Sequence, residues 1–116
     1  MTEHFDAAAF GALRQTLGDE MVGMLLGKYL VQMEEKIGLL RQGVEARDMA
    51  QVRQQAHDLT SSSGSVGLGA MRDKASECEF AVKEGREDAA LEHARALIAL
   101  APETAAAIRE TFPGLP

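Results

Sequence analysis

The sequence predicts an all-α protein, an antiparallel four-helix bundle with a short additional N-terminal helix. Apolar residues recur every three or four positions along most of the chain, which is the period of a helix and not of a strand. Short breaks rich in glycine, aspartate or serine separate these segments, so neighbouring helices are expected to run antiparallel. Aromatic residues make up only 4% of the 116 residues and tryptophan is absent. The core is therefore expected to be aliphatic, which favours helices.

Aspartate and glycine delimit the first two predicted helices. Asp6 can cap a short first helix that runs to about Leu17. Gly18 ends it, and Asp19 is the expected N-cap of the second helix. Along the second helix, apolar side chains at spacings of three to five residues include Met21, Leu25, Leu26, Met33, Ile37, Leu40 and Val44. This spacing is typical of an amphipathic helix.

The third and fourth helices are predicted to form a hairpin. Asp48 is the expected N-cap of the third helix, which runs to about Ser63. Segment 61–69 is rich in serine and glycine and is either a connector or the frayed end of that helix. The fourth helix is predicted over about 68–83, and Gly85 follows it as a residue that commonly ends helices.

The fifth helix is expected to open at Asp88 and to end near Phe112. Pro102 either kinks it or begins a new turn as its first residue. No internal repeat, low-complexity tract or linker interrupts the chain, so a single domain is predicted over 1–116. Because the predicted bundle is complete, a monomer is the expected state.

Composition argues against several classes of protein. The net charge is −6 and no basic stripe is visible, which disfavours binding to nucleic acid or to anionic membranes. The longest apolar run, 97–102, is far shorter than the roughly 20 residues that span a bilayer. The N-terminus does not read as a signal peptide, and the one cysteine, Cys78, occupies a core position and has no internal disulfide partner. These features predict a cytoplasmic protein.

One histidine of the third helix lies outside its apolar face. That face is centred between Val52, Ala56 and Leu59, and at about 100° per residue His57 lies roughly 130° from the centre. The neighbouring positions around the histidine hold Arg53, Gln54, Thr60 and Ser61, with Gly64 one turn further on. The imidazole is therefore expected to point outward, beside small residues that let a partner approach. The simpler alternative is a solvated surface histidine without a role.

An antiparallel hairpin would place a carboxylate beside this imidazole. His57 lies eleven positions before Leu68, and Glu79 lies eleven after it. Glu79 can accept a hydrogen bond from Nδ1–H, which fixes the tautomer and leaves Nε2 free as a nucleophile. Lys83 and Arg53, each one turn away, would lie near an anionic group on Nε2. The alternative for Glu79 and Lys83 is an ordinary surface pair at i,i+4.

Residues 56–67, AHDLTSSSGSVG, resemble the signature of histidine phosphotransfer domains. That signature has an Ala-His pair, Leu two residues on, a run of small residues and Gly ten residues after the histidine. Matching positions hold His57, Leu59, Ser62, Ser63, Gly64 and Gly67. The Cys78–Glu79 pair and Lys83 are similar to the family's fourth helix. The specific motif covers about 53–83, whereas the helix order resembles the family over nearly the whole chain.

The resemblance implies a phosphoryl carrier of a bacterial multistep two-component phosphorelay. His57 would accept a phosphoryl group from a receiver-domain aspartate and pass it to another receiver. The sequence has neither a Walker loop nor a kinase glycine-rich motif, so no ATP site is expected. No cofactor or metal site is expected in this chain, and the partner receiver would supply Mg²⁺. Receivers of response regulators or hybrid kinases would dock on the second and third helices, where Met24 or Leu26 would add apolar contact.

The resemblance also implies roles for the residues around the histidine. Glu79 would orient the imidazole, and Lys83 and Arg53 would balance the phosphoryl charge. Partner contact is expected from Gln54, Thr60, Ser61 and Gly64, and a structural role from Leu59 and Gly67.

Two positions depart from the family pattern. Thr60 and Ser61 stand where the family usually has lysine and glycine, so one positive charge is missing. Both changes slightly favour an alternative function, a binding module that regulates a kinase or receiver without being phosphorylated. A metal or haem bundle is a third possibility, but the Glu92–His93 pair has no second such pair to face it.

Overall fold

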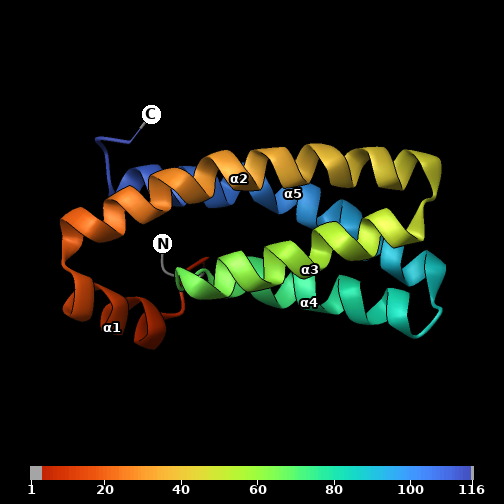
Figure 1. Ribbon diagram of the computed structural model, residues 1–116, viewed down its shortest axis with the longest axis horizontal. Coiled ribbons are helices and arrows are strands. Elements are labelled where there is room, and N and C mark those ends of the chain that lie inside the picture. The colour runs from red at the N-terminus through yellow and green to blue at the C-terminus, as the bar shows by residue number, and fades with distance from the viewer. Residues whose placement is uncertain (1–3, 116) are drawn as a thin grey trace.

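The computed structural model describes residues 4–115, which form five helices and no strand. In chain order the helices are α1 (Ala7–Leu17), α2 (Asp19–Ala46), α3 (Met49–Ser65), α4 (Gly69–Lys83) and α5 (Glu87–Thr111). Figure 1 shows the four long helices side by side in one bundle, with α1 folded back beside the N-terminal end of α2. The predicted fold class, an antiparallel four-helix bundle with a short N-terminal helix, is confirmed.

The four long helices enclose the expected aliphatic core. The largest fully buried apolar side chains are Leu26, Leu40, Leu59, Leu68, Met71, Leu91, Leu97 and Ile108. Burying each of these contributes roughly 1.5–3 kcal/mol. The buried positions of α3 are Val52, Gln55, Ala56, Leu59 and Ser63. This buried face leaves His57 on the outside of α3, as the sequence predicts.

Side chains cap two of the helices as predicted, and a third prediction is wrong. Asp6 caps α1 and Asp48 caps α3, each by accepting a hydrogen bond from a backbone N–H three residues on. Asp19 is not the N-cap of α2 but its first residue, and Gly18 occupies the cap with φ +82°. The Asp19 carboxylate instead pairs with Arg14 of α1 at 2.8 Å. This ion pair joins the two helices across their turn.

The serines after His57 continue α3, and the connector within segment 61–69 is limited to residues 66–68. Helix α3 continues to Ser65, two residues past its predicted end at Ser63. Ser65 Oγ donates to the carbonyl of Ser61, and buried Ser63 shares a 2.8 Å hydrogen bond with Tyr29 of α2. Burial raises the pKa of Tyr29 to about 12, while the hydrogen bond to Ser63 acts in the opposite direction. The phenol is therefore neutral and ties α2 to the end of α3.

The fifth helix starts one residue earlier than predicted and is continuous. It begins at Glu87, so Asp88 lies in its first turn, and it passes through Pro102 without ending. Arg47, left-handed at φ 52°, reaches across from the α2–α3 turn and pairs with Glu87 at 2.8 Å and Asp88 at 3.4 Å. These exposed pairs connect the α2–α3 turn to the start of α5.

A glycine in the α3–α4 turn lets the N-terminal helix dock on the hairpin. Gly67 has φ +74°, and a Cβ placed there would lie 3.0 Å from Cα of Phe10. The carbonyl of Gly67 accepts a 2.8 Å hydrogen bond from the backbone of Asp6. The turn, and with it the register of α3 against α4, is thus held by the start of α1.

Gly67→Ala is expected to destabilise the fold more than Gly85→Ala. Both glycines have positive φ, so each substitution carries the left-handed strain of about 1–2 kcal/mol. Only Gly67 also meets backbone at 3.0 Å, whereas the space beside Gly85 is open. Urea unfolding of both variants measures the difference, and equal losses would show that the Phe10 contact does not constrain the turn.

Candidate functional site

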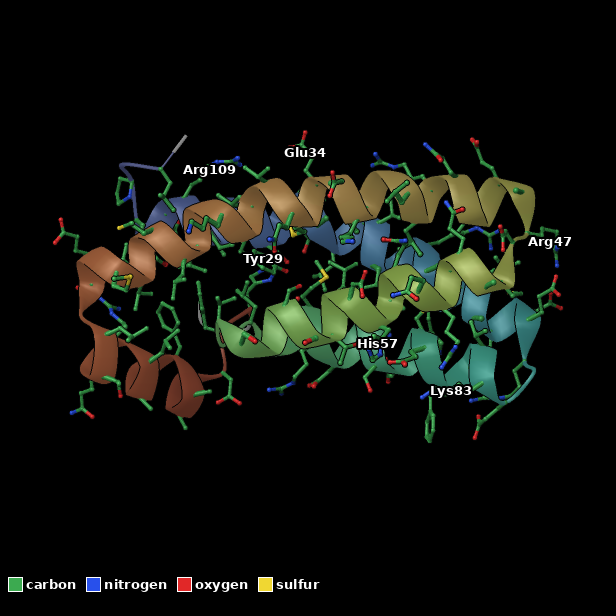
Figure 2. The ribbon with its side chains drawn as sticks, in the orientation of Figure 1. Tyr29, Glu34, Arg47, His57, Lys83 and Arg109 are labelled. Atoms are coloured by element: carbon green, nitrogen blue, oxygen red, sulfur yellow. The ribbon has the colours of Figure 1, made fainter. Side chains whose placement is uncertain are left out.

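His57 presents its imidazole on the outer surface of the α3–α4 hairpin. Its side chain is 61% exposed. Figure 2 shows His57 on α3 and Lys83 on the neighbouring α4, at the same side of the bundle. A docking partner can therefore reach the ring without any rearrangement of the core.

Glu79 of α4 holds the imidazole from the hairpin side. His57 Nδ1 and Glu79 Oε2 lie 2.9 Å apart, and the Glu79 side chain is only 11% exposed. The prediction that these two residues face each other across the hairpin is therefore confirmed. An ionised carboxylate only accepts hydrogen bonds, so Nδ1 carries the proton and Nε2 keeps its lone pair.

The electrostatics of the pair keep the carboxylate ionised. Burial alone would raise the pKa of Glu79, but the hydrogen bonds from His57 and Lys83 and the electrostatic attraction of both groups outweigh it. The pKa of Glu79 is consequently lowered from its usual 4.5. Lys83 Nζ lies 3.4 Å from the same Oε2 that faces the imidazole.

Two basic side chains lie on the side of the His57–Glu79 pair away from the turn. Lys83 follows Glu79 by four residues and Arg53 precedes His57 by four, so both are one helical turn from the pair. Arg53 is exposed and forms no ion pair within residues 4–115. Its guanidinium is free to meet an anionic group on the ring.

The predicted positions of α3 toward the turn carry no charge. The Thr60 hydroxyl donates to the carbonyl of Ala56 at 2.8 Å, so its proton is engaged within α3. Ser61 is exposed, and Gly64 is half-buried against the side chain of Arg72. This side of the site is small and polar.

The remaining predicted residues divide between surface and core. Gln54 is exposed and donates to Asp58 at 3.0 Å. Leu59 is fully buried and Gly67 forms the turn, so both occupy structural positions. Among the predicted docking residues of α2, Met24 is 55% exposed, but the prediction for Leu26 is wrong because its side chain is fully buried in the core.

The sequence places the docking surface on the second and third helices but does not reveal which polar side chains of α2 lie beside the histidine. Lys36 of α2 forms an ion pair with Asp58 at 3.0 Å, next to the histidine. The same two helices enclose a polar hollow of about 360 Å³ beside the imidazole. Its lining residues are Gln32, Glu35, Lys36, His57, Asp58, Ser61 and Ser62. Periodicity along a single helix carries no signal for this pairing, because the relative shift of α2 and α3 is not encoded in either pattern.

Other chemically capable residues lie apart from the histidine face. Cys78 is fully buried, and burial, with the nearby charge of Glu79, raises its pKa to about 11. His93 is half-buried, with Nδ1 4.0 Å from Glu77. In the part of the chain that the structure describes, no group of three or more His, Cys, Asp or Glu side chains could hold a metal ion. Nor is any helix in that part long and apolar enough to cross a membrane.

Comparisons with known proteins agree with the resemblance found in the sequence. A family model for the Hpt domain matches residues 24–110. The chain is also similar to the crystal structure of histidine-containing phosphotransfer protein B (HptB) from Pseudomonas aeruginosa PAO1, with a TM-score of 0.75 and 25% sequence identity. That match covers 95% of this chain and 91% of the other. Curated protein sequences gave no significant match.

Replacing Glu79 by glutamine is expected to flatten the acid dependence of stability. Because the pKa of Glu79 is lower in the folded protein than in the unfolded chain, its ionised form stabilises the fold above pH 4.5 or so. That contribution is lost as the pH falls through the folded pKa. The free energy of unfolding, measured by urea titration between about pH 6 and 3, should therefore fall less steeply in Glu79→Gln than in the wild type.

The matched control is Glu103→Gln, which removes an exposed carboxylate of α5. Its acid profile should run parallel to that of the wild type. If the Glu79→Gln profile did so too, the bond to His57 would not stabilise the ionised carboxylate.

Proposed function

Since this chain belongs to the Hpt domain family, whose members carry phosphoryl groups in phosphorelays, we propose that it accepts one on Nε2 of His57. The donor would be the aspartyl phosphate of one receiver domain, and a second receiver would take the group on. The observation that carries the proposal is an exposed imidazole whose Nδ1 is bonded to a buried carboxylate. That arrangement directs the free lone pair of Nε2 toward solvent.

In the proposed step, the lone pair of His57 Nε2 attacks the phosphorus of the aspartyl phosphate. A P–N bond forms as the P–O bond to the receiver's carboxyl group breaks, and the aspartate leaves with that electron pair. The proton stays on Nδ1, so the ring becomes positively charged, and ionised Glu79 stabilises this charge through its hydrogen bond. Onward transfer reverses the sequence, and the protonated ring is then a good leaving group.

Charge balance at the phosphoryl group would come from Lys83 and Arg53. A phosphoryl group brings about −1.5 to −2 units of charge at neutral pH. Phosphoryl transfer depends on positioning the reacting groups and on stabilising that charge, because there is little covalent chemistry for the surrounding side chains to perform. Both side chains are exposed, so each can turn toward the phosphoryl oxygens.

The receiver would dock across α2 and α3. Exposed apolar side chains on α2 are Met21, Met24 and Val31, and the same helix also lines the polar hollow beside His57. We assign Mg²⁺ to the receiver and no cofactor to this chain, since the carboxylates nearest the ring already have partners, Glu79 in Lys83 and Asp58 in Lys36. Monomeric state, cytoplasmic location and a single domain over 1–116 stay predictions.

The competing function uses the same face for binding alone. It would regulate a kinase or receiver without accepting a phosphoryl group. The uncharged Thr60, with its hydroxyl engaged by Ala56, is the observation that favours it. Phosphorylation of the protein itself separates the two.

His57→Gln should abolish phosphorylation by a phosphorylated receiver. Glutamine is polar and of similar size but has no nucleophilic nitrogen, so the fold should persist while the label is lost. The measurement is transfer of ³²P from the receiver, followed by a test for acid-labile, base-stable phosphate on the wild-type chain.

His93→Gln is the control, because His93 is a half-buried histidine of α5 outside the proposed site. It should take up label as the wild type does. Label retained on His57→Gln would reject His57 as the phosphoryl acceptor. An unlabelled wild type that still binds the receiver would favour the binding module.

Met24→Ala should weaken receiver binding by about three- to tenfold, which corresponds to roughly 0.7–1.4 kcal/mol. Phe80→Ala is the matched control, since Phe80 is a similarly exposed apolar side chain, at 62% against 55% for Met24, on α4 instead of α2. Titration of each variant with a fluorescent receiver measures both affinities. A larger effect at Phe80 would move the docking surface to α4.

A further inference from the structure

The hollow between α2 and α3 places a lysine in the same space as the reactive imidazole. Lys36 and His57 both line it, and the Lys36–Asp58 ion pair of 3.0 Å spans the two helices there. The side chains of Lys36 and Asp58 are 29% and 31% exposed, so both are accessible from the hollow.

The charges that line the hollow are unfavourable for a phosphoryl group unless this lysine changes partner. Glu35 and Asp58 are acidic, and Lys36 is the only lysine or arginine in the lining, all of which the structure describes. A phosphoryl group on His57 would add further negative charge beside the two carboxylates. Thr60, where the family usually has a lysine, supplies no positive charge to offset this negative charge.

We propose that Lys36 is a phosphoryl-binding residue that Asp58 holds in the resting protein and that moves to the phosphoryl oxygens once His57 is loaded. The inference rests on the proposed function, because it concerns the phosphorylated state of the same histidine. It assigns the charge missing at Thr60 to a different helix, α2.

The exchange of partners is physically reasonable on both sides. Lysine is a point charge on a flexible four-carbon stem with three donors, so a rotamer change can redirect it within the hollow. Asp58 is not left without a partner, because its second oxygen already accepts a hydrogen bond from Gln54. A phosphoryl group carries more charge than one carboxylate and attracts the ammonium more strongly.

The exchange would also change the charge of the docking surface when His57 is phosphorylated. Lys36 belongs to α2, the helix that carries the exposed Met24 and Val31. Release of the Lys36–Asp58 pair changes the charge that this face presents, since Asp58 then keeps only the neutral Gln54 as a partner. A receiver would therefore meet different electrostatics before and after loading.

The test uses phosphoramidate, a small phosphoryl donor that loads histidine without any receiver. The pKa of the phosphoryl group on His57 is then read by ³¹P NMR, with the resonance assigned by its absence in His57→Gln. A cation bound to the phosphoryl oxygens lowers that pKa, so Lys36→Met should raise it by about half a unit or more. Lys36→Arg should restore most of the shift, and Lys28→Met, another lysine of α2, should leave the pKa unchanged.

A double-mutant cycle with Asp58→Asn separates direct binding from a general field effect. If Asp58 competes for Lys36, Lys36→Met should raise the phosphoryl pKa more in the Asp58→Asn background than in the wild type. Independent charges would instead give additive shifts. Thermal unfolding of the unloaded proteins is measured alongside, since loss of the ion pair as a structural contact changes stability only.

A phosphoryl pKa that is the same in Lys36→Met and wild type, or shifts that are strictly additive in the cycle, would overturn the inference. Either result would leave His57 phosphorylated and the carrier intact. Failure of the receiver to label the wild type would instead reject the proposed function, and the NMR result would still decide whether Lys36 binds a phosphoryl group on this ring.

Discussion

The hydrogen bond between His57 and Glu79 is the constraint on which the rest of the site depends. It exists only if α3 and α4 keep one register, because a slip of one residue would turn the carboxylate by about 100°. Gly67 sets that register by making the turn, with the backbone of Phe10 packed against it at 3.0 Å. The short N-terminal helix, remote from the imidazole in sequence, is therefore part of what orients it.

Positive charge around the imidazole comes from several helices instead of from the next turn of α3. Arg53 lies on α3, Lys83 on α4 and Lys36 on α2. Lys83 and Lys36 each already face a carboxylate, so a phosphoryl group must compete for them. A cation fixed beside the ring would stabilise the phosphorylated state permanently. Cations shared with carboxylates make retention and release of the group closer in free energy, which suits a carrier.

The sequence predicted what depends on one helix or on one short turn. The stripe of Val52, Ala56 and Leu59 places His57 outside, and equal spacing from the turn brings Glu79 opposite. The sequence did not predict contacts that depend on how two helices shift along each other. The Lys36–Asp58 pair is such a contact, and so is the burial of Leu26, whose face of α2 is covered by neighbouring helices. The predicted N-cap at Asp19 was wrong for a local reason, since the Asp19 carboxylate pairs with Arg14 instead of with the N-terminus of α2.

Exposure and burial divide the work of the site between two residues. Glu79 is buried, so its hydrogen bond to Nδ1 is partly shielded from water and fixes the tautomer. His57 is 61% exposed, so its ring is accessible to a docking partner. A buried imidazole would require an opening motion at each transfer, and an exposed carboxylate would let the ring rotate away. A rigid hairpin with the acceptor inside and the nucleophile outside avoids both problems, which explains why a site on the open surface of a helical bundle is sufficient.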